Sequence, residues 1–314
     1  MAVYTLVKEI ELKNFLQQYD LGSLVSFKGI VEGIENTNFR INTEKGSYIL
    51  TLFEKRVNEK DLPFFMNLQK HLSSSGFQCP IPIANKDHII INNLCGKKAI
   101  IISLLEGKQI LNSKPEHCFQ IGEMISKFKN ITANFKESRK NTLDIVNCKL
   151  IFSKCLTIKS HEFINIIDQM QKEIETIEKN WPKNLPKGII HGDLFKDNIF
   201  FQKDKFSGLI DFYFSCNDYY AYELAITTNA WCFNNSQFNK ENFISLMKGY
   251  KTNSNFNEEE ENSYNILLRA AAMRILVTRL HDQLFHPNDA IVVPKDPLEY
   301  FAILKWHQNN SVFN

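Results

Sequence analysis

Two apolar runs enclose a polar loop in the stretch Gly188-Ile189-Ile190-His191-Gly192-Asp193-Leu194-Phe195-Lys196-Asp197-Asn198-Ile199-Phe200-Phe201. A third apolar run, Ser207-Gly208-Leu209-Ile210-Asp211-Phe212, follows shortly afterwards. This pattern predicts strand, loop, strand, turn and strand, with polar residues where the strands end. Asp193 and Asn198 lie in one loop, and Asp211 opens the loop after the third strand. The three oxygen-bearing side chains can therefore converge on one site.

Such a set of oxygens suits phosphoryl transfer. In that reaction one carboxylate orients and deprotonates the attacking hydroxyl, while a second carboxylate and an amide oxygen hold Mg²⁺, a hard ion that prefers oxygen ligands. We assign the first role to Asp193 and the second to Asn198 and Asp211. The alternative is that these residues only form turns, as Asp and Asn beside Gly usually do. Specified residues at fixed spacing, followed by Ile-Asp-Phe behind a strand, favour the functional interpretation.

The order His191-Gly192-Asp193, four further residues, Asn198, and then Ile210-Asp211-Phe212 resembles a known signature. It is similar to that of the small-molecule branch of the protein kinase-like fold, the aminoglycoside phosphotransferase and choline kinase group. The resemblance implies an α+β, two-lobed fold with ATP and Mg²⁺ as cofactors. Residues 1–105 then form an N-lobe built on a small antiparallel sheet, and residues 106–314 form a mostly helical C-lobe.

The composition fits a soluble enzyme of this kind. With 314 residues and 44% hydrophobic content, the chain can bury a substantial core. The net charge is only +2 and the basic residues are spread throughout, which argues against a nucleic-acid partner. We see neither a signal peptide nor an apolar run of membrane length, so we expect a cytoplasmic protein without a membrane partner. The seven cysteines lack Cys-x-x-Cys spacing, which predicts reduced core residues. The sequence leaves the oligomeric state unknown.

Extended patterns dominate the N-terminal part. They predict a three-stranded antiparallel meander over residues 24–53, with turns near Gly33 and at 43–46. A helix over 61–74 and a strand over 98–105 follow, the latter continuous and β-branched as in a strand buried on both faces. The resemblance places the hinge between the lobes and the adenine-reading backbone at the end of that strand. Ser103 and Leu105 are therefore candidate nucleotide-binding residues.

The phosphate-binding residues are less well defined. Gly29 and Gly33 lie where kinase-like proteins cover the phosphates with a hairpin. Two glycines at this spacing are equally typical of an ordinary turn. Kinase-like proteins carry a Lys or Arg on the third strand, and this chain has Thr51 there. Lys55 shares the strand face of Thr51 and is a candidate substitute. A solvated strand end explains Lys55 slightly better.

The C-terminal part is predicted to be helical. Ser113-Lys114-Pro115-Glu116 has the pattern of a capping box that opens a helix. Further helices are predicted over 163–181, 243–250 and 258–284. The last of these carries Arg269, Arg274 and Arg279. Since helix arginines are usually surface charges, we expect at least two of the three to be exposed.

Longer stretches are similar to the homoserine kinase branch of this fold, among them Ile210-Asp211-Phe212-Tyr213-Phe214, Asn229-Ala230-Trp231-Cys232-Phe233 and Pro294-Lys295-Asp296-Pro297-Leu298-Glu299-Tyr300. The resemblance spans nearly the whole chain and includes Thr51. It implies transfer of phosphate from ATP to L-homoserine, a step towards threonine.

Homoserine offers a primary hydroxyl to Asp193, a carboxylate that suits an Arg fork, and an ammonium that suits a carboxylate. We assign the carboxylate to Arg274 or Arg279 and the ammonium to Asp218. Tyr213 and Trp231 are the candidate walls of the substrate pocket.

Two alternatives stay open at this point. The first is a kinase for another small alcohol, such as an aminoglycoside, choline or methylthioribose. The second is a nucleotide-binding regulator without catalysis, which the absence of the usual phosphate-clamping Lys and its Glu partner suggests. Activity assays with a panel of hydroxyl substrates test the first alternative. Turnover of any of these alcohols would exclude the second.

Overall fold

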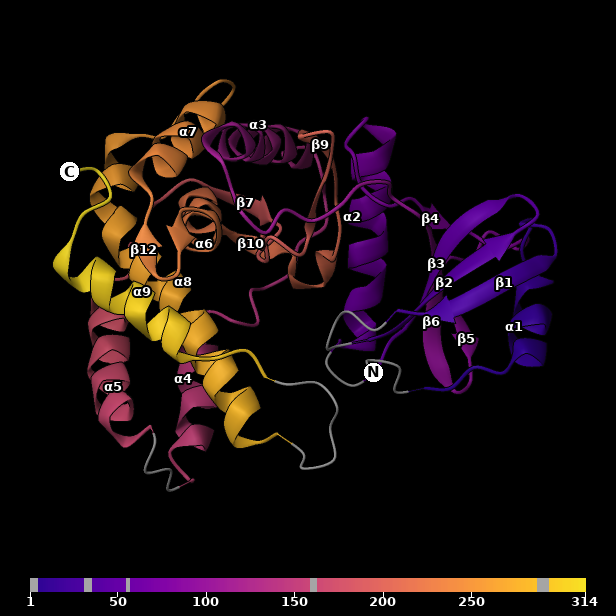
Figure 1. Cartoon of the computed structure of the whole chain (residues 1–314), viewed down its shortest axis with the longest axis horizontal. Coiled ribbons are helices and arrows are strands. Elements are labelled where there is room, and N and C mark those ends of the chain that lie inside the picture. The colour runs from indigo at the N-terminus through magenta and orange to yellow at the C-terminus, as the bar shows by residue number, and fades with distance from the viewer. Residues whose placement is uncertain (1–4, 31–35, 55–56, 159–162, 287–293) are drawn as a thin grey trace. The chain divides into compact units, whose positions relative to one another are not determined.

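The computed structural model describes residues 5–30, 36–54, 57–158, 163–286 and 294–314. The chain forms two compact units (Figure 1). The first comprises residues 1–107 together with 207–213, and the second comprises 108–206 and 214–314. Residues 207–213 therefore join a unit whose other members all precede residue 108. The architecture is the predicted one, an antiparallel N-terminal sheet and a largely helical C-terminal part.

The first unit is built on one antiparallel sheet. Strands β1 (Leu24–Gly29), β2 (Thr37–Thr43) and β3 (Gly46–Leu52) confirm the predicted meander. The sheet has six strands in the order β1-β2-β3-β6-β4, and β5 also pairs with β6. The added strands are β4 (Pro82–Ile83), β5 (Asn92–Leu94) and β6 (Lys97–Ser103). The unit also contains α1 (Glu9–Leu16), the 3-10 helices η1 (Glu59–Asp61) and η2 (Phe212–Phe214, which ends in the second unit), and α2 (Leu62–Ser74).

The core of the first unit lies between α1 and the sheet. Leu12, Phe15 and Leu16 of α1 are buried against sheet residues that include Leu50 and Ile101. The apolar positions of α1 recur at three and four residues, so they share one face of the helix. Alternate residues of β2 are buried in the same way, as the period of a strand requires.

The second unit is mainly helical. Its helices are α3 (Pro115–Thr132), α4 (Ile145–Cys155), α5 (Ile164–Lys179), α6 (Tyr220–Trp231), α7 (Lys240–Tyr250), α8 (Glu258–Leu284) and α9 (Leu298–Asn309). Its short strands are β7 (Lys187–Ile190), β8 (Ile199–Gln202), β10 (Cys216–Tyr219), β11 (Phe233–Asn234) and β12 (Gln237–Phe238), and β9 (Lys205–Leu209) crosses into the first unit. Helix α8 packs against α4, α5, α6 and α9, which makes it the centre of the unit. None of the described helices is long and apolar enough to cross a membrane.

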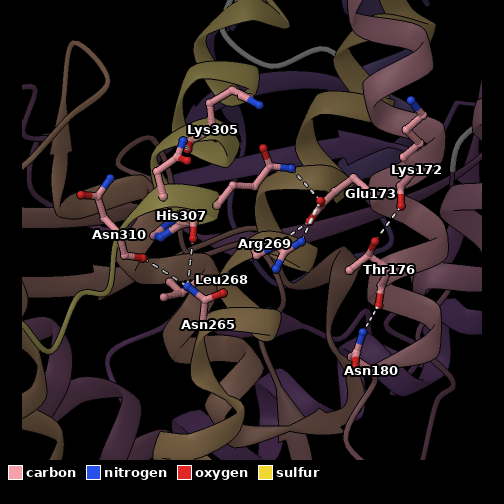
Figure 2. Close-up of polar contacts among 12 residues, drawn as sticks. Lys172, Glu173, Thr176, Asn180, Asn265, Leu268, Arg269, Lys305, His307 and Asn310 are labelled. Carbon is pink, nitrogen blue, oxygen red and sulfur yellow. Dashed lines mark hydrogen bonds and ion pairs between the residues drawn. The ribbon is translucent and has the colours of Figure 1, made fainter.

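A buried ion pair fastens α8 to its neighbours (Figure 2). Arg269 on α8 donates from Nε and Nη2 to the two oxygens of Glu173 on α5, at 2.6 and 2.8 Å. Gln308 on α9 donates to the same carboxylate at 2.6 Å. Planar forks of this kind add geometric specificity to the charge. One carboxylate thus holds three helices in register.

The prediction that at least two of the three α8 arginines are surface charges was wrong. Their side chains are only 19%, 3% and 12% exposed for Arg269, Arg274 and Arg279 respectively. Each one lies within reach of a carboxylate from another element. By contrast, the cysteine prediction is confirmed: all seven cysteines are free, and six are buried.

Helices α3 and α7 touch backbone to backbone. A Cβ at Gly122 on α3 would lie 2.1 Å from the carbonyl oxygen of Leu246, and one at Gly249 on α7 would lie 2.0 Å from that of Phe119. Backbone atoms cannot move aside as a flexible side chain can. Both glycines are therefore required by the close approach of the helices.

We predict that Gly249→Ala lowers the free energy of unfolding by about 1–3 kcal/mol, because the added methyl forces the two helices apart. Chemical denaturation monitored by circular dichroism measures the effect. Lys248→Ala is the matched control, since Lys248 is the exposed neighbour on the same helix. Equal stability of the two variants would contradict the packing described here.

Candidate active site

The polar loop predicted from the sequence connects β7 to β8 and is folded by short-range hydrogen bonds. Gly192 has φ of +77°, and a Cβ there would lie 2.9 Å from the carbonyl oxygen of Phe214. Only glycine adopts this conformation in this space without strain. The amide of Phe195 then donates to the carbonyl oxygen of Asp193 at 2.8 Å, and that of Asn198 to Phe195 at 3.1 Å. The loop is thus wound tightly around Asp193.

Asp193 and Asn198 are in direct contact. The Asn198 Nδ2 donates to the backbone oxygen of Asp193 at 2.9 Å and to its Oδ2 at 2.8 Å. Because both bonds use the amide nitrogen, the Asn198 Oδ1 is left as an acceptor, and it makes no hydrogen bond with any residue that the structure describes. The predicted base and one predicted metal ligand are therefore neighbours.

Helix α6 holds this loop through two hydrogen bonds. Oε2 of Glu223 accepts from the amide of Gly192 at 2.8 Å. The indole Nε1 of Trp231 donates to the carbonyl oxygen of Leu194 at 3.0 Å. Trp231 is 0% exposed, so the structure places it within the core behind the loop and not at the surface of a pocket. We therefore give Trp231 a supporting role.

The carbonyl oxygen of Trp231 also explains why Ser113 does not cap helix α3 as the sequence predicted. The predicted capping box was wrong: the residue that precedes α3 is Lys114, not Ser113. The Ser113 hydroxyl instead donates to the carbonyl oxygen of Trp231 at 2.8 Å and accepts from Asn242 at 3.0 Å. A buried carbonyl at the end of α6 competes successfully for the hydroxyl that the local pattern assigned to the helix start.

Arg274 is the buried cation nearest to the loop among the described residues. Its side chain is 3% exposed, and Nη2 lies 3.9 Å from Oδ1 of Asp193. The guanidinium carbon lies 5.6 Å from the centre of the Phe214 ring. The Arg274 Nε is buried and has no hydrogen-bond partner among the described residues. Burial acts to lower the pKa of Arg274, but Tyr222 and Asp193 act in the opposite direction and the net shift is upward.

Two further carboxyl groups surround Arg274. Oδ2 of Asp218 accepts from Asn141 at 2.7 Å and Oδ1 accepts from the amide of Tyr219 at 2.7 Å. Burial raises the pKa of Asp218. Burial also raises the pKa of Glu223 to about 8, against the opposing effects of the Gly192 amide and Arg274. Glu223 is therefore mostly protonated at neutral pH, and Arg274 is left to balance Asp193 and Asp218.

The residues predicted from the first unit form a group of their own. Asp211 has φ of +63°, a conformation that is uncommon outside glycine and is found at functional sites. The ring of Tyr213 packs edge-on against Phe53 and Phe65, with ring centres 5.1 and 5.7 Å apart. Burial and the charge of Asp211 raise the pKa of Tyr213, whose hydroxyl is hydrogen-bonded to Thr51. That Asp211 meets Asp193 and Asn198 stays a prediction.

Thr51 occupies the place of the usual strand cation without supplying a charge. It is buried, and its hydroxyl donates to Oδ1 of Asn38 at 2.7 Å. Gly29 is the last residue of β1 and pairs with Phe39. Gly33 and Lys55, the other phosphate-binding candidates, lie outside the described residues.

The predicted hinge residues are well anchored within the first unit. Oγ of Ser103 accepts from the amide of Ile81 at 2.9 Å. The side chain of Leu105 packs onto Gly208, where a Cβ would lie 2.5 Å from its Cδ1. Sequence reasoning missed three other groups in this region: Glu223, which accepts from the Gly192 amide, Asn141, which donates to Asp218, and Tyr222, which lies close to Arg274. None of the motifs quoted from the sequence singled these residues out.

Comparison with known proteins identifies the family of the chain. A model of the phosphotransferase enzyme family (APH) matches residues 26–245. The chain is 43% identical over 309 residues to the homoserine kinase of Parvibaculum lavamentivorans, covering 98% of this chain and 96% of that protein. It is 42% identical over 309 residues to the homoserine kinase of Sinorhizobium fredii, covering 98% and 95%.

Solved structures show the same fold at low identity. The amicoumacin kinase hAmiN, in complex with AMP-PNP, Ca²⁺ and Ami, superposes with a TM-score of 0.74 at 13% identity, covering 96% of this chain and 92% of that one. Choline kinase from Cryptosporidium parvum Iowa II gives a TM-score of 0.66 at 11% identity, covering 96% and 95%. The chain therefore belongs to the phosphotransferase enzyme family. Within that family, its full-length relatives place it among the homoserine kinases.

We predict that Glu223→Gln changes how stability depends on pH. The pKa of Glu223 rises from an ordinary 4.5 to about 8 on folding, so the folded state binds the proton more tightly and wild-type stability falls as pH rises through that window. Gln keeps an oxygen for the Gly192 amide but does not titrate. The melting temperature of the variant minus that of the wild type should increase from about pH 5 to about pH 8. A pH-independent difference would show that Glu223 ionises normally.

Proposed function

We propose that the chain transfers the γ-phosphoryl group of ATP to the hydroxyl of L-homoserine, forming O-phospho-L-homoserine and ADP. The observation that carries the proposal is the bonded pair Asp193 and Asn198 beside the buried, under-satisfied Arg274. The names of the full-length relatives agree with the reaction. The product is the kind of phosphorylated amino acid that threonine synthesis consumes, as the family resemblance implies.

Asp193 is the proposed base. Oδ2 is held by the amide of Asn198, while Oδ1 faces Arg274, so the carboxylate is fixed at both ends. A fixed carboxylate aims one lone pair at the acceptor hydroxyl and takes its proton as the oxygen attacks phosphorus.

Asn198 and Asp211 are the proposed ligands of Mg²⁺. The donor set fits the ion, since a carboxylate and an amide oxygen are hard ligands and the Asn198 Oδ1 has no hydrogen bond among the described residues. When bound, Mg²⁺ would neutralise charge on the phosphates of ATP. The left-handed backbone of Asp211 supports the same role, because strained conformations persist where function requires them.

The proposed nucleotide contacts come from the first unit. Gly29 and Gly33 are proposed to let backbone amides approach the phosphates, and Ser103 and Leu105 are proposed to contact adenine. Thr51 supplies no charge, so the phosphates depend on backbone amides, on Mg²⁺ and on Lys55. The relative hAmiN was solved with AMP-PNP, which supports a nucleotide of this class.

Arg274 is preferred to Arg279 as the carboxylate-binding residue. Arg279 already donates to the backbone oxygen of Asp296 and to Glu299, at 2.9 and 2.6 Å. The Arg274 Nε is buried without a hydrogen-bond partner among the described residues, and Nη2 lies 3.9 Å from Oδ1 of Asp193. A buried guanidinium donor without a partner is costly, so a bound carboxylate is a natural complement. Asp218, held by Asn141, is proposed to receive the ammonium, and Tyr213 to line the site.

We predict that Asp193→Asn lowers kcat by about 10²–10⁴-fold while the dissociation constant of ATP changes little, because only the base is lost. Steady-state ADP release with L-homoserine measures kcat, and calorimetry measures ATP binding. Serine and threonine serve as substrate controls. Unchanged kcat in the variant would support a non-catalytic nucleotide-binding protein instead.

We also predict that Arg274→Met raises the KM for L-homoserine by about 10–100-fold or more, as expected for the loss of a buried charge-assisted contact. The same change should reduce the free energy of unfolding less than Arg269→Met does, because Arg269 is fully paired with Glu173 and Arg274 is not. Kinetics and denaturation of both variants test this. A larger loss of stability in Arg274→Met would assign that residue a structural role.

A further inference from the structure

A polar pocket lies in the second unit, where residues at the end of α9 meet residues of α7 and α8. Its volume is about 540 Å³, which is within the range of small-molecule sites. Carboxamide side chains dominate its walls, namely those of Asn265, Gln308, Asn309 and Asn310. None of the described residues assigned above to catalysis or to substrate binding lines it. The pocket is therefore a second candidate binding site, made of other side chains.

His307 contributes a buried acceptor to the wall of this pocket. Its side chain Nε2 is bonded to Oδ1 of Asn229 at 2.8 Å, and the Asn229 Nδ2 donates to the carbonyl oxygen of Leu268 at 2.9 Å. Because the amide nitrogen of Asn229 is used on a carbonyl, its oxygen must accept, and the proton is assigned to Nε2 of His307. Nδ1 is then a lone-pair acceptor. His307 is 1% exposed, and Nδ1 is buried without a hydrogen-bond partner among the described residues.

The imidazole of His307 stays neutral at physiological pH. Burial lowers the pKa of His307 to about 3, and the charge of Arg269 acts in the same direction. The lone pair of Nδ1 is therefore not satisfied by a proton from solvent, and it requires a hydrogen-bond donor. Arg269 disfavours further positive charge at this position. A neutral O–H or N–H group is the donor that fits.

The carboxamides around His307 complement hydroxyl groups. Figure 2 shows that Nδ2 of Asn265 donates to the carbonyl oxygens of His307 and Asn310, at 3.0 and 3.3 Å. Both amide hydrogens of Asn265 are thus used, and its oxygen is the group left for a ligand. Nδ2 of Asn309 and of Asn310 each donates to one backbone oxygen, so each keeps one N–H and one oxygen to offer. A hydroxyl both donates and accepts, and it suits walls of this kind.

The aromatic and charged groups of the pocket narrow the class of ligand. The rings of Phe238 and Trp306 are half-buried, and their centres lie 4.5 Å apart, so they form an apolar wall. Among the described residues, no side-chain carboxylate lines the pocket, and an organic cation has no counterion there. Lys240 is the charged side chain of the lining, and its Nζ already donates to the backbone oxygen of Asn314 at 2.8 Å.

We propose that this pocket binds a neutral, polyhydroxylated molecule of the size of a monosaccharide. One hydroxyl donates to Nδ1 of His307, neighbouring hydroxyls bond to the carboxamides, and the C–H face of the ring packs on Phe238 and Trp306. The inference goes beyond the proposed function and does not depend on it, because no residue of the phosphoryl-transfer site takes part.

Titrations followed by the imidazole nitrogen NMR signals test the contact with His307. D-Glucose and myo-inositol are the probes, and inorganic phosphate and spermidine are the charged controls. The His307→Gln variant assigns the His307 signals by their disappearance. We expect a saturable upfield shift of the Nδ1 signal with at least one probe, because accepting a hydrogen bond moves that signal upfield. If neither probe shifts the signal, solvent satisfies Nδ1 and the proposal is overturned. Saturable shifts with phosphate or spermidine would also overturn the ligand class.

Two variants show whether the probe binds in this pocket. His307→Gln keeps a donor for Asn229 and removes the Nδ1 acceptor, and we expect the dissociation constant of the probe to rise about 10–100-fold. Asn309→Ala changes an exposed residue of the rim, so it tests the pocket without disturbing the core, and we expect a rise of about 2–10-fold. Saturation-transfer NMR measures both constants.

Asn180→Ala is the matched control for Asn309→Ala. Both residues are exposed, and in both Nδ2 donates at 2.8 Å to the carbonyl oxygen four residues earlier, but Asn180 does not line the pocket. We expect the dissociation constant of the probe to be unchanged in this control. Wild-type affinity in both His307→Gln and Asn309→Ala would place the probe elsewhere on the protein and overturn the proposal. Equal losses in Asn180→Ala and Asn309→Ala would overturn it as well.

Discussion

The hydrogen bond from the Gly192 amide to Glu223 is the constraint on which the site depends. A loop between two strands has backbone groups that no strand can pair, and those beside Asp193 are bonded to α6 instead. The indole N–H of Trp231, at the other end of α6, donates a hydrogen bond to the carbonyl oxygen of Leu194. Because α6 is buried almost throughout, the loop is anchored to the core of its unit. The proposed base, Asp193, is therefore held in place by its own unit, and preorganisation of this kind lowers the cost of reaching a transition state.

Charged groups in this region are only partly paired with one another within the described residues. Arg274 is buried next to Asp193, with Asp218 close by, while burial leaves Glu223 largely protonated at neutral pH. The Arg274 Nε is buried and has no hydrogen-bond partner among the described residues. An unsatisfied buried donor reduces the stability of the free protein, and a bound ligand could supply its partner. Proteins tolerate such shortages where binding is selected over stability.

The three arginines of α8 show why a linear pattern could not assign roles. They are spaced by five residues, which turns each by about 140° from the last around the helix, so they point in three directions. Arg269 meets Glu173 on α5, Arg274 meets Asp193, and Arg279 meets Tyr300 on α9. Each direction leads to an element distant in sequence. Residue type and spacing alone suggested surface charges for most of them, and the packing of α8 at the centre of the unit reversed that expectation.

By itself the sequence determined the features that depend on short separations: the meander, the loop after β7, the helical C-terminal part and the family. Asp193 and Asn198 are five positions apart, so their hydrogen bond follows from one loop. Only the tertiary structure decided that Trp231 lies in the core, that Ser113 bonds to it, and that Arg279 holds Tyr300. The physical reason is that these contacts depend on which helices pack together. Local periodicity fixes which face of a helix is apolar, but it does not fix which distant side chain meets it.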